Sequence, residues 1–330
     1  MTNYFHPYSE EEQGKSIKMK DDLQQASDTE GRRLTFSVVI PTKNRKEDLL
    51  SAVRSVLSQS RLPDELIIVD QSVTNAADSL IRSRLTDHKE IGYKYIFNNK
   101  LTGLTAAKNV AVKASGSDIL LFIDDDIVLD KNFIQVVLGV FKQRPELSGV
   151  GGVVQLPVHR QSRLRGLITA IFRIGPFKDV RIPLQYDCYT KNLDVIPTKL
   201  LSGGLSALRR DLFRHVEFDG SLKGASVIED LDFYSRAKGF KFVLARKAVA
   251  LHNFSPVSRA GLRRSFEQKC AGFVYVFYNH IPKTPYSLFA FFWRNVGFFL
   301  DAISESLRYR TFDPILGSIN GWRKSLKKNS

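Results

Sequence analysis

The chain has 330 residues, of which 43% are hydrophobic and 11% aromatic, so it can form about two domains with a sizeable core, and disorder throughout is excluded. Its two cysteines, Cys188 and Cys270, exclude a disulfide framework and a structural zinc cluster and favour a reducing compartment. The net charge of +15 lies in the C-terminal part: residues 1–150 hold 20 Lys and Arg against 21 Asp and Glu, whereas residues 151–330 hold 29 against 13. This excess predicts an anionic partner, which can be nucleic acid, an acidic lipid surface or a phosphorylated substrate.

Residues 1–33 are expected to form a mobile polar leader. They mix Glu, Lys, Gln, Asp and Ser and lack the apolar stretch of a signal peptide. The longest stretches without a charged residue, 147–159 and 270–282, contain 13 residues each. Neither is long enough for a membrane-spanning helix, which needs about 20 residues.

Strand-like and helix-like patterns alternate from residue 34 onward. The predicted order is a strand at 34–41, a helix at 46–59, a strand at 65–70, a helix near 75–85, a strand near 93–97, a helix near 104–114 and a strand at 119–123. Asn44 and Glu47 have the spacing of a capping box, which places residues 41–44 in the loop after the first strand. The alternation predicts an α/β sheet domain over residues 34–155, with ligands at the carboxyl ends of its strands.

Two common nucleotide-binding motifs are missing from the sequence. No G-x-G-x-x-G follows the first strand, and G-x-x-x-x-G-K-[ST] occurs nowhere. Both the dinucleotide-dependent oxidoreductases and the P-loop proteins therefore become less favoured.

Three carboxylates, Asp124, Asp125 and Asp126, directly follow the apolar strand at 119–123. Their mutual repulsion is costly, and a divalent cation would relieve it, because Mg²⁺ and Mn²⁺ are usually held by one or two carboxylates together with phosphate oxygens. The alternative is a solvated acidic turn that caps a helix at 131–143.

Two further features of the first half suit a nucleotide. Asp70 ends the apolar strand at 65–70 and could accept hydrogen bonds from a base or ribose, although carboxylates at strand ends are also ordinary turn formers. The turn at Gly103 opens a helix of small residues whose free N–H groups, with Lys108, could face a diphosphate. Close packing of a small-residue helix on the sheet explains this second pattern equally well.

In the second half, Glu229, Asp230 and Asp232 lie beside apolar neighbours. A confined carboxylate has a raised pKa, which suits a general base, but an acid-rich helix N-terminus is the simpler explanation. His252 ends another strand-like stretch, where a hydrogen-bonded structural role is commoner than metal binding.

Taken in order, the segments 38–45, 67–70, 103–109, 122–126 and 229–230 resemble the family-2 glycosyltransferases, and the likeness extends over roughly residues 36–253. The resemblance implies a GT-A fold: a Rossmann-like α/β mixed sheet flanked by helices, followed by a C-terminal helical extension. It implies a nucleotide-sugar-binding half at 34–155 and an acceptor-binding half at 156–253.

The resemblance also implies roles for individual residues. The expected donor contacts are Pro41, Thr42, Asn44, Asp70, Lys108, Asn109, Asp124 and Asp125. Asp126 is expected to hold a divalent metal, Mn²⁺ or Mg²⁺, with His252 approaching it. Asp230 is expected to be the general base, supported by Glu229. The reaction is then inverting transfer from a nucleotide-sugar to an acceptor hydroxyl on a glycan or lipid-linked saccharide.

Two departures from the family pattern affect these expectations. The usual Asp-Asp-Gly-Ser after the second strand is Asp70-Gln71-Ser72-Val73 here, which leaves the nucleotide open, and the absence of Q-x-x-R-W argues against a processive synthase. A sugar nucleotidyltransferase is an alternative, but it would show a Gly-rich basic loop after the first strand. A non-enzymatic nucleic-acid or membrane-binding protein would explain the charge but not the acids at strand ends, so no nucleic-acid partner is expected.

Residues 254–330 are aromatic and basic. One face of a predicted helix there carries apolar residues, namely Leu288, Phe289, Phe292, Val296, Phe299, Leu300, Ile303 and Leu307. Arg294, Asp301 and Glu305 fall on the other face. We expect an interfacial helix on anionic lipid, with the protein cytoplasmic and peripheral on the inner face of the cell membrane; packing against the protein core or a second copy is the alternative.

Overall fold

The computed structural model describes residues 33–155, 163–172, 194–220, 222, 228–253 and 261–328. Of the predicted leader it describes only Arg33. The strands are β1 (Phe36–Thr42), β2 (Glu65–Asp70), β3 (Gly92–Phe97), β4 (Ile119–Ile123), β5 (Ile127–Leu129), β6 (Gly149–Gln155), β7 (Val195–Thr198), β8 (Leu205–Arg209) and β9 (Phe242–His252). The α-helices are α2 (Lys46–Leu57), α3 (Asp78–Arg84), α4 (Leu104–Ala114), α5 (Phe133–Gln143), α6 (Arg163–Phe172), α8 (Glu229–Arg236), α9 (Leu262–His280), α10 (Pro285–Tyr309) and α11 (Asp313–Lys328). Two 3₁₀ turns are η2 (Leu85–Asp87) and η3 (Arg210–Arg214).

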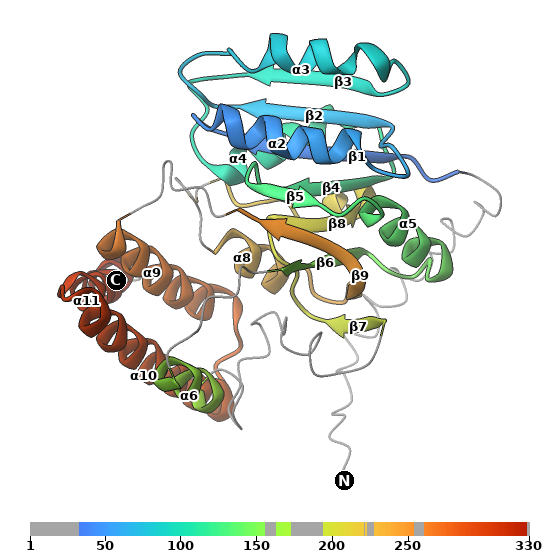
Figure 1. Cartoon of the computed structure of the whole chain (residues 1–330). Helices are drawn as coiled ribbons and strands as arrows, with labels where there is room; N and C mark the ends of the chain where they lie inside the picture. Colours follow the sequence, from blue (N-terminus) through green and yellow to red (C-terminus); the bar gives the residue numbers. More distant parts are fainter. Residues whose placement is uncertain are drawn as a thin grey trace.

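All of these strands join one mixed sheet with the order β3-β2-β1-β4-β8-β6-β9-β5, and β7 pairs with β9 (Figure 1). Strands β3, β2, β1 and β4 are neighbours in the sheet and run parallel to one another, as the α/β alternation predicts. Strand β8 lies between β4 and β6 and runs antiparallel to both. The register pairs Thr42 with Asp70, so the carboxyl ends of β1 and β2 lie at the same level. The predicted α/β mixed sheet flanked by helices is confirmed.

The sheet is covered on both faces because successive side chains of a strand point to opposite sides. Val38 and Ile40 of β1 pack in the cluster that includes α2, α3 and α5, while Val39 between them packs in the cluster that includes α4, η3 and α8. Strands buried on both faces read as continuous apolar segments, which is why β2 and β4 could be recognised from sequence.

The capping box predicted at Asn44 and Glu47 is wrong. The residue before α2 is Arg45, and it makes no side-chain cap bond. Asn44 has a φ of 57°, in the left-handed region that Asn tolerates better than most residues. Its side-chain oxygen accepts from the Val73 N–H at 3.1 Å, and its own N–H donates to the Ser72 hydroxyl at 2.7 Å. Asn44 therefore ties the loop after β1 to the loop after β2.

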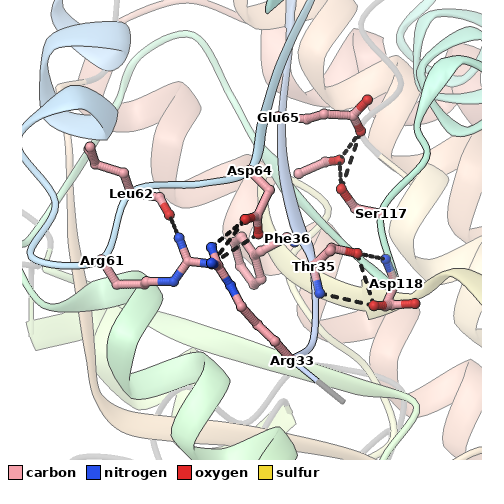
Figure 2. Close-up of polar contacts among 10 residues, drawn as sticks. Arg33, Thr35, Phe36, Arg61, Leu62, Asp64, Glu65, Ser117 and Asp118 are labelled. Atoms are coloured by element: carbon pink, nitrogen blue, oxygen red, sulfur yellow. Dashed lines mark hydrogen bonds and ion pairs between the residues drawn. The ribbon is translucent and has the colours of Figure 1, made fainter. Parts of the chain in front are cut away.

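A polar network fastens the amino ends of β1, β2 and β4 (Figure 2). The Asp118 carboxylate accepts from the N–H and the hydroxyl of Thr35, each at 2.9 Å, and Asp64 accepts from the Phe36 N–H at 2.9 Å. The Glu65 carboxylate accepts from Ser117 at 3.2 Å. Every carboxylate of this edge is thus paired with a donor from a neighbouring segment.

The last three helices and α6 form a separate helical layer beside the sheet (Figure 1). Helices α9 and α11 cross closely because Gly317 and Gly321 leave room for the backbone of α9: a Cβ built on Gly317 would lie 2.2 Å from the Arg263 carbonyl oxygen. Helix α10 packs on α6 through Gly297, which lies against Phe172. None of the helices in the described residues is both long and apolar enough to cross a membrane.

Candidate active site

The acidic turn after β4 meets the end of β1. Thr42 donates its hydroxyl to Asp125 Oδ2 at 2.7 Å, and Arg45 Nη1 lies 3.0 Å from Asp125 Oδ1 and 3.8 Å from Asp126 Oδ2. Burial raises the pKa of Asp125 to about 6, although the bonds from Thr42 and Arg45 act in the opposite direction. Arg45 is a site residue that the sequence did not indicate, because its position opposite the acids arises only when β1 and β4 pair.

Asp126 lies beside His252, with Asp126 Oδ1 and His252 Nε2 3.0 Å apart. Strand β5, which the sequence did not predict, creates this pairing: it leaves the acidic turn and runs antiparallel to β9, so that Ile127 faces His252. No cluster of three or more His, Cys, Asp or Glu side chains suited to a metal occurs among the described residues. A carboxylate and an imidazole at this distance could nevertheless serve as two ligands of a divalent ion.

Asp70 is buried at the carboxyl end of β2. Its Oδ1 accepts from the Ser72 N–H at 2.8 Å, and its Oδ2 accepts from the Tyr95 hydroxyl. Together with the Asn44 bonds, these contacts fix the rim where a base and ribose are predicted to lie. Pro41 is buried just inside this rim, opposite Val69.

Lys108 connects the two predicted halves. It is almost completely buried, and its Nζ donates to the Gly203 carbonyl oxygen at 2.9 Å and to Glu229 Oε1 at 3.2 Å. Its ammonium lies over the rings of Phe122 and Phe218, at 5.9 and 5.1 Å from their centroids. In this structure the partners of Lys108 are groups of the protein, so its expected contact with a diphosphate stays a prediction.

The turn at Gly203 and Gly204 lets three acids approach one another. A Cβ on Gly203 would lie 2.4 Å from Glu229 Oε1, and one on Gly204 would lie 2.1 Å from Asp124 Oδ2. The Gly204 carbonyl oxygen also accepts from the Asp124 N–H at 3.1 Å. Only residues without a side chain fit between these carboxylates.

Burial raises the pKa of every carboxyl in this group. For Glu229 the pKa rises to about 7, with the negative charges of Asp230 and Asp124 adding to the effect and the positive charge of Lys108 opposing it. The pKa values of Asp230 and Asp124 are raised by the same cause, burial. Asp230 Oδ1 accepts from the Leu231 N–H at 2.7 Å, which holds the carboxylate at the start of α8. Carboxyls with pKa values shifted upward in this way are typical of sites that move protons.

Asn109 has a different surrounding from the other predicted donor contacts. Its side-chain nitrogen donates to the Phe218 carbonyl oxygen at 2.8 Å, and its oxygen accepts from the Phe218 N–H at 3.2 Å. Both ends of the amide are therefore engaged in holding the segment before α8.

The structure brings Thr42, Asp125 and Asp126 together at one place, and Asp124, Glu229 and Asp230 around Lys108 at another.

A sequence-family model matches the fold and the motifs. It is described as "Glycosyl transferase family 2" and matches residues 37–217, more than half of the chain. The chain belongs to glycosyl transferase family 2. This match covers the acidic turn after β4 and the glycine turn at Gly203, whereas Asp230 and His252 lie beyond it.

Curated relatives of this family-2 chain include bacterial glycosyltransferases and an O-antigen biosynthesis protein. The chain is 24% identical over 236 residues to the O-antigen biosynthesis protein RfbC of Myxococcus xanthus, a match that covers 68% of this chain and 18% of the relative. It is 28% identical over 91 residues to the GalNAc(5)-diNAcBac-PP-undecaprenol beta-1,3-glucosyltransferase of Campylobacter jejuni, covering 28% of this chain and 29% of the relative. The matched regions span well under half of these relatives.

Solved structures share the fold of the family-2 chain at low sequence identity. The mannosyltransferase PcManGT from Pyrobaculum calidifontis, solved with GDP-Man and Mn²⁺, superposes with a TM-score of 0.59 at 15% identity and covers 96% of both chains. GalNAc-T7, solved with UDP, GalNAc and Mn²⁺, gives a TM-score of 0.53 at 14% identity, covering 84% of this chain and 58% of that one. The chain thus has the predicted GT-A fold.

Proposed function

We propose that this protein is an inverting, metal-assisted glycosyltransferase that moves a sugar from a nucleotide-sugar donor to an acceptor hydroxyl. The observation that carries the proposal is the meeting of Asp124, from the end of β4, with Glu229 and Asp230, from the start of α8, around the buried Lys108. In this proposal residues 34–155 bind the donor and residues 156–253 bind the acceptor.

The donor occupies the carboxyl ends of β1, β2 and β4. Asn44 and Asp70 hold the rim of the base and ribose site through their bonds to the loop at Ser72, with Pro41 and Thr42 at the end of β1. The Asp125 carboxylate, held by Thr42 and Arg45, is aimed at the ribose. Lys108 and Asn109 place the helix α4 beside the diphosphate.

The metal is held by Asp126 and His252, whose facing oxygen and nitrogen atoms form a hard and a borderline ligand suited to Mn²⁺ or Mg²⁺. When bound, such an ion supplies positive charge for the departing diphosphate. Arg45 lies beside the carboxylates of Asp125 and Asp126 in the same turn.

Asp230 acts as the general base. Its carboxylate removes the proton from the acceptor hydroxyl while that oxygen forms a bond to the anomeric carbon, and the bond from this carbon to the diphosphate breaks with its electron pair leaving on the diphosphate. A pKa raised by burial makes Asp230 a stronger base than an exposed carboxylate. The Leu231 N–H orients the carboxylate, and Glu229 holds Lys108 beside it.

The acceptor is a glycan or a lipid-linked saccharide, and the protein acts in the cytoplasm at the inner face of the cell membrane. The Campylobacter relative is named for an acceptor linked to undecaprenol through a diphosphate, and the Myxococcus relative is named for O-antigen biosynthesis. The low cysteine content is consistent with a reducing compartment.

A thermal-shift screen of UDP-, GDP- and dTDP-sugars tests this function. One of them, with Mn²⁺ present, should raise the melting temperature by about 4 °C at 100 times its Kd, since a ligand that binds only the folded state stabilises it by mass action. EDTA or Asp126→Ala should remove most of this shift, whereas the control Glu47→Ala, at a side chain that is 83% exposed, should keep it.

Two outcomes would contradict the proposal. If no nucleotide-sugar shifted the melting temperature, the donor site would be wrong. If the nucleotide bound equally well with excess EDTA and to Asp126→Ala, the metal assignment alone would be wrong, and a metal-independent transferase would remain.

A further inference from the structure

Exposed apolar side chains concentrate in the helical layer. Of the 18 large hydrophobic side chains that are exposed among the described residues, 14 lie in α6 or in the stretch from α9 to α11. Six of them form what we call the outer face of α10: Leu288, Phe289, Phe292, Phe299, Leu300 and Leu307. Phe292 is 62% exposed and Leu307 is 71% exposed. These values are far above those of a helix stripe that packs on a core.

Helix α10 buries two charged side chains against the protein together with the apolar Ala290, Phe291 and Ala302. Arg294 and Glu305 are buried, and the Arg294 guanidinium lies over the rings of Phe273 and Phe298 at 5.6 and 5.8 Å. Gly297 on the same side allows close contact with Phe172 of α6. A helix at the surface of a globular protein in water normally buries its apolar stripe and exposes its charges. This reversal indicates that the outer face contacts an apolar medium or partner.

The exposed charge around this face has a single sign. All eight exposed charged side chains of the described stretch 261–325 are Lys or Arg, and its four acidic side chains are buried or half-buried. Lys283 precedes α10, and Arg308 and Arg310 follow the end of its outer face. A second copy of this chain would place positive charge against positive charge, whereas an anionic lipid surface offers both apolar depth and complementary charge.

We propose that the outer face of α10 lies in the interface of an anionic lipid bilayer, with its aromatic and leucine side chains at the boundary of the acyl chains and the flanking bases at the headgroups. The helix then lies parallel to the membrane plane, the arrangement expected for a helix with one apolar face and cationic flanks.

This binding mode orients the site relative to the membrane, and in this respect the inference rests on the proposed function. Helix α9 packs on the start of α8 where Gly272 contacts Ile228, the residue before Glu229. At the other end of α9, His280 Nε2 lies 2.9 Å from the fully buried Asp232 of α8. The helical layer that meets the bilayer is thereby fastened to the helix that carries Asp230, which suits an acceptor anchored in lipid.

Cosedimentation of the full-length chain with vesicles tests the proposal. The probes are two kinds of vesicle. One contains phosphatidylcholine alone, and the other contains phosphatidylcholine with about 30% phosphatidylglycerol. We expect binding to the anionic vesicles that weakens with salt, and a loss of at least about tenfold in affinity for the double variant Phe292→Ser with Phe299→Ser, since each ring removed withdraws apolar area from the interface. The matched control is Val73→Ser with Leu80→Ser, which removes two exposed apolar side chains from the sheet region.

Three results would overturn the inference: equal binding by both double variants, binding to neutral vesicles as strong as to anionic ones, or a wild-type dimer in analytical ultracentrifugation that the α10 variant converts to a monomer without any vesicle binding. The last result would assign the face to a second copy. A nucleotide-sugar thermal shift retained by the α10 variant shows that it is folded, and it separates a failure of membrane binding from a failure of the proposed function.

Discussion

The pKa values of buried carboxyls shift in opposite directions at the amino ends of the strands, here called the amino edge, and at their carboxyl ends, the carboxyl edge. At the amino edge, burial would raise the pKa of Glu65, but hydrogen bonds from Lys94, Ser37 and Gly116 lower it to about 2. At the carboxyl edge, burial prevails and raises the pKa of Asp125 to about 6 and that of Glu229 to about 7. Both edges belong to the same strands, so burial alone does not decide the outcome.

The difference lies in the number of donors available to each carboxylate. Glu65 accepts from the hydroxyls of Ser37, Ser115 and Ser117 as well as from the Gly116 N–H, so its negative charge is well solvated by the protein. Around Lys108, three carboxylates share one ammonium. The first arrangement stabilises the fold, whereas the second leaves negative charge poorly compensated, which is how functional sites commonly differ from structural ones.

The largest expected effect is on kcat, which should depend on a carboxylate at the carboxyl edge but not on one at the amino edge. Asp230→Asn keeps the shape of the side chain but removes the proton acceptor, so kcat should fall by about 10² to 10⁴ while the donor Kd changes little. The isosteric control at the amino edge is Asp118→Asn, which should leave kcat near the wild-type value and lower the melting temperature, because Asp118 accepts two bonds from Thr35. Steady-state kinetics, donor titration and thermal denaturation of the two variants make the comparison.

Near-normal turnover by Asp230→Asn would remove this residue from the chemistry. If Asp118→Asn lost turnover to the same extent, the contrast between the edges would itself be wrong.

A smaller effect compares the edges by stability. Glu65→Gln should lower the free energy of unfolding by about 1 to 3 kcal/mol, because a charged acceptor with several donors is lost. Glu229→Gln should not lower it, because burial raises the pKa of Glu229 and its charged form is disfavoured in the folded state at this pH, while Asp124 and Asp230 still supply negative charge to Lys108. Urea denaturation at pH 8 measures both values, and a larger loss for Glu229→Gln would mean that its ion pair with Lys108 is chiefly structural.

The last comparison concerns the pH dependence of stability, which should have opposite signs at the two edges. The pKa of Glu65 falls from 4.5 to about 2 on folding, so its contribution is present above pH 4.5 and is lost as the pH drops toward 2. The pKa of Glu229 rises from 4.5 to about 7, so the folded state loses stability as the pH rises through this range. Each difference between wild type and its Gln variant should change by about 3 kcal/mol across its own window, because a pKa change of one corresponds to about 1.4 kcal/mol. Denaturation curves from pH 2 to 8 test the slopes, and slopes of one sign for both residues would contradict the comparison.

The local sequence pattern was sufficient to predict the elements that are buried on both faces. The predicted bounds of β2, α4 and β4 coincide with the observed ones, because an apolar stretch between polar ends defines a buried strand without help from distant residues. The antiparallel insertion of β8 and the short β5 could not be predicted in this way, since both depend on pairing with strands far along the chain.

The candidate site, too, could be predicted from the sequence only in part. The sequence indicated the acids at strand ends, but the place of Arg45 opposite Asp125 and the grouping of Asp124 with Glu229 depend on how the strands are ordered in the sheet. The apolar periodicity of α10 was visible in the sequence, yet periodicity does not say to which side a face is turned. The capping box failed because Asn44 bonds to the loop after β2 instead of to its own helix.

The glycine turn between the carboxylates has a consequence for building hybrid enzymes from relatives. Gly203 and Gly204 belong by sequence to the half proposed to bind the acceptor, yet the space they leave is filled by Glu229 from that half and Asp124 from the other. A hybrid in which this half is exchanged between relatives therefore needs the glycine turn and the loop of Asp124 to come from the same parent, or from parents in which the two match in shape. Junctions placed on the far side of β8, away from the turn, should give hybrids that fold, whereas junctions that separate the turn from Asp124 should give chains whose two halves no longer close on each other.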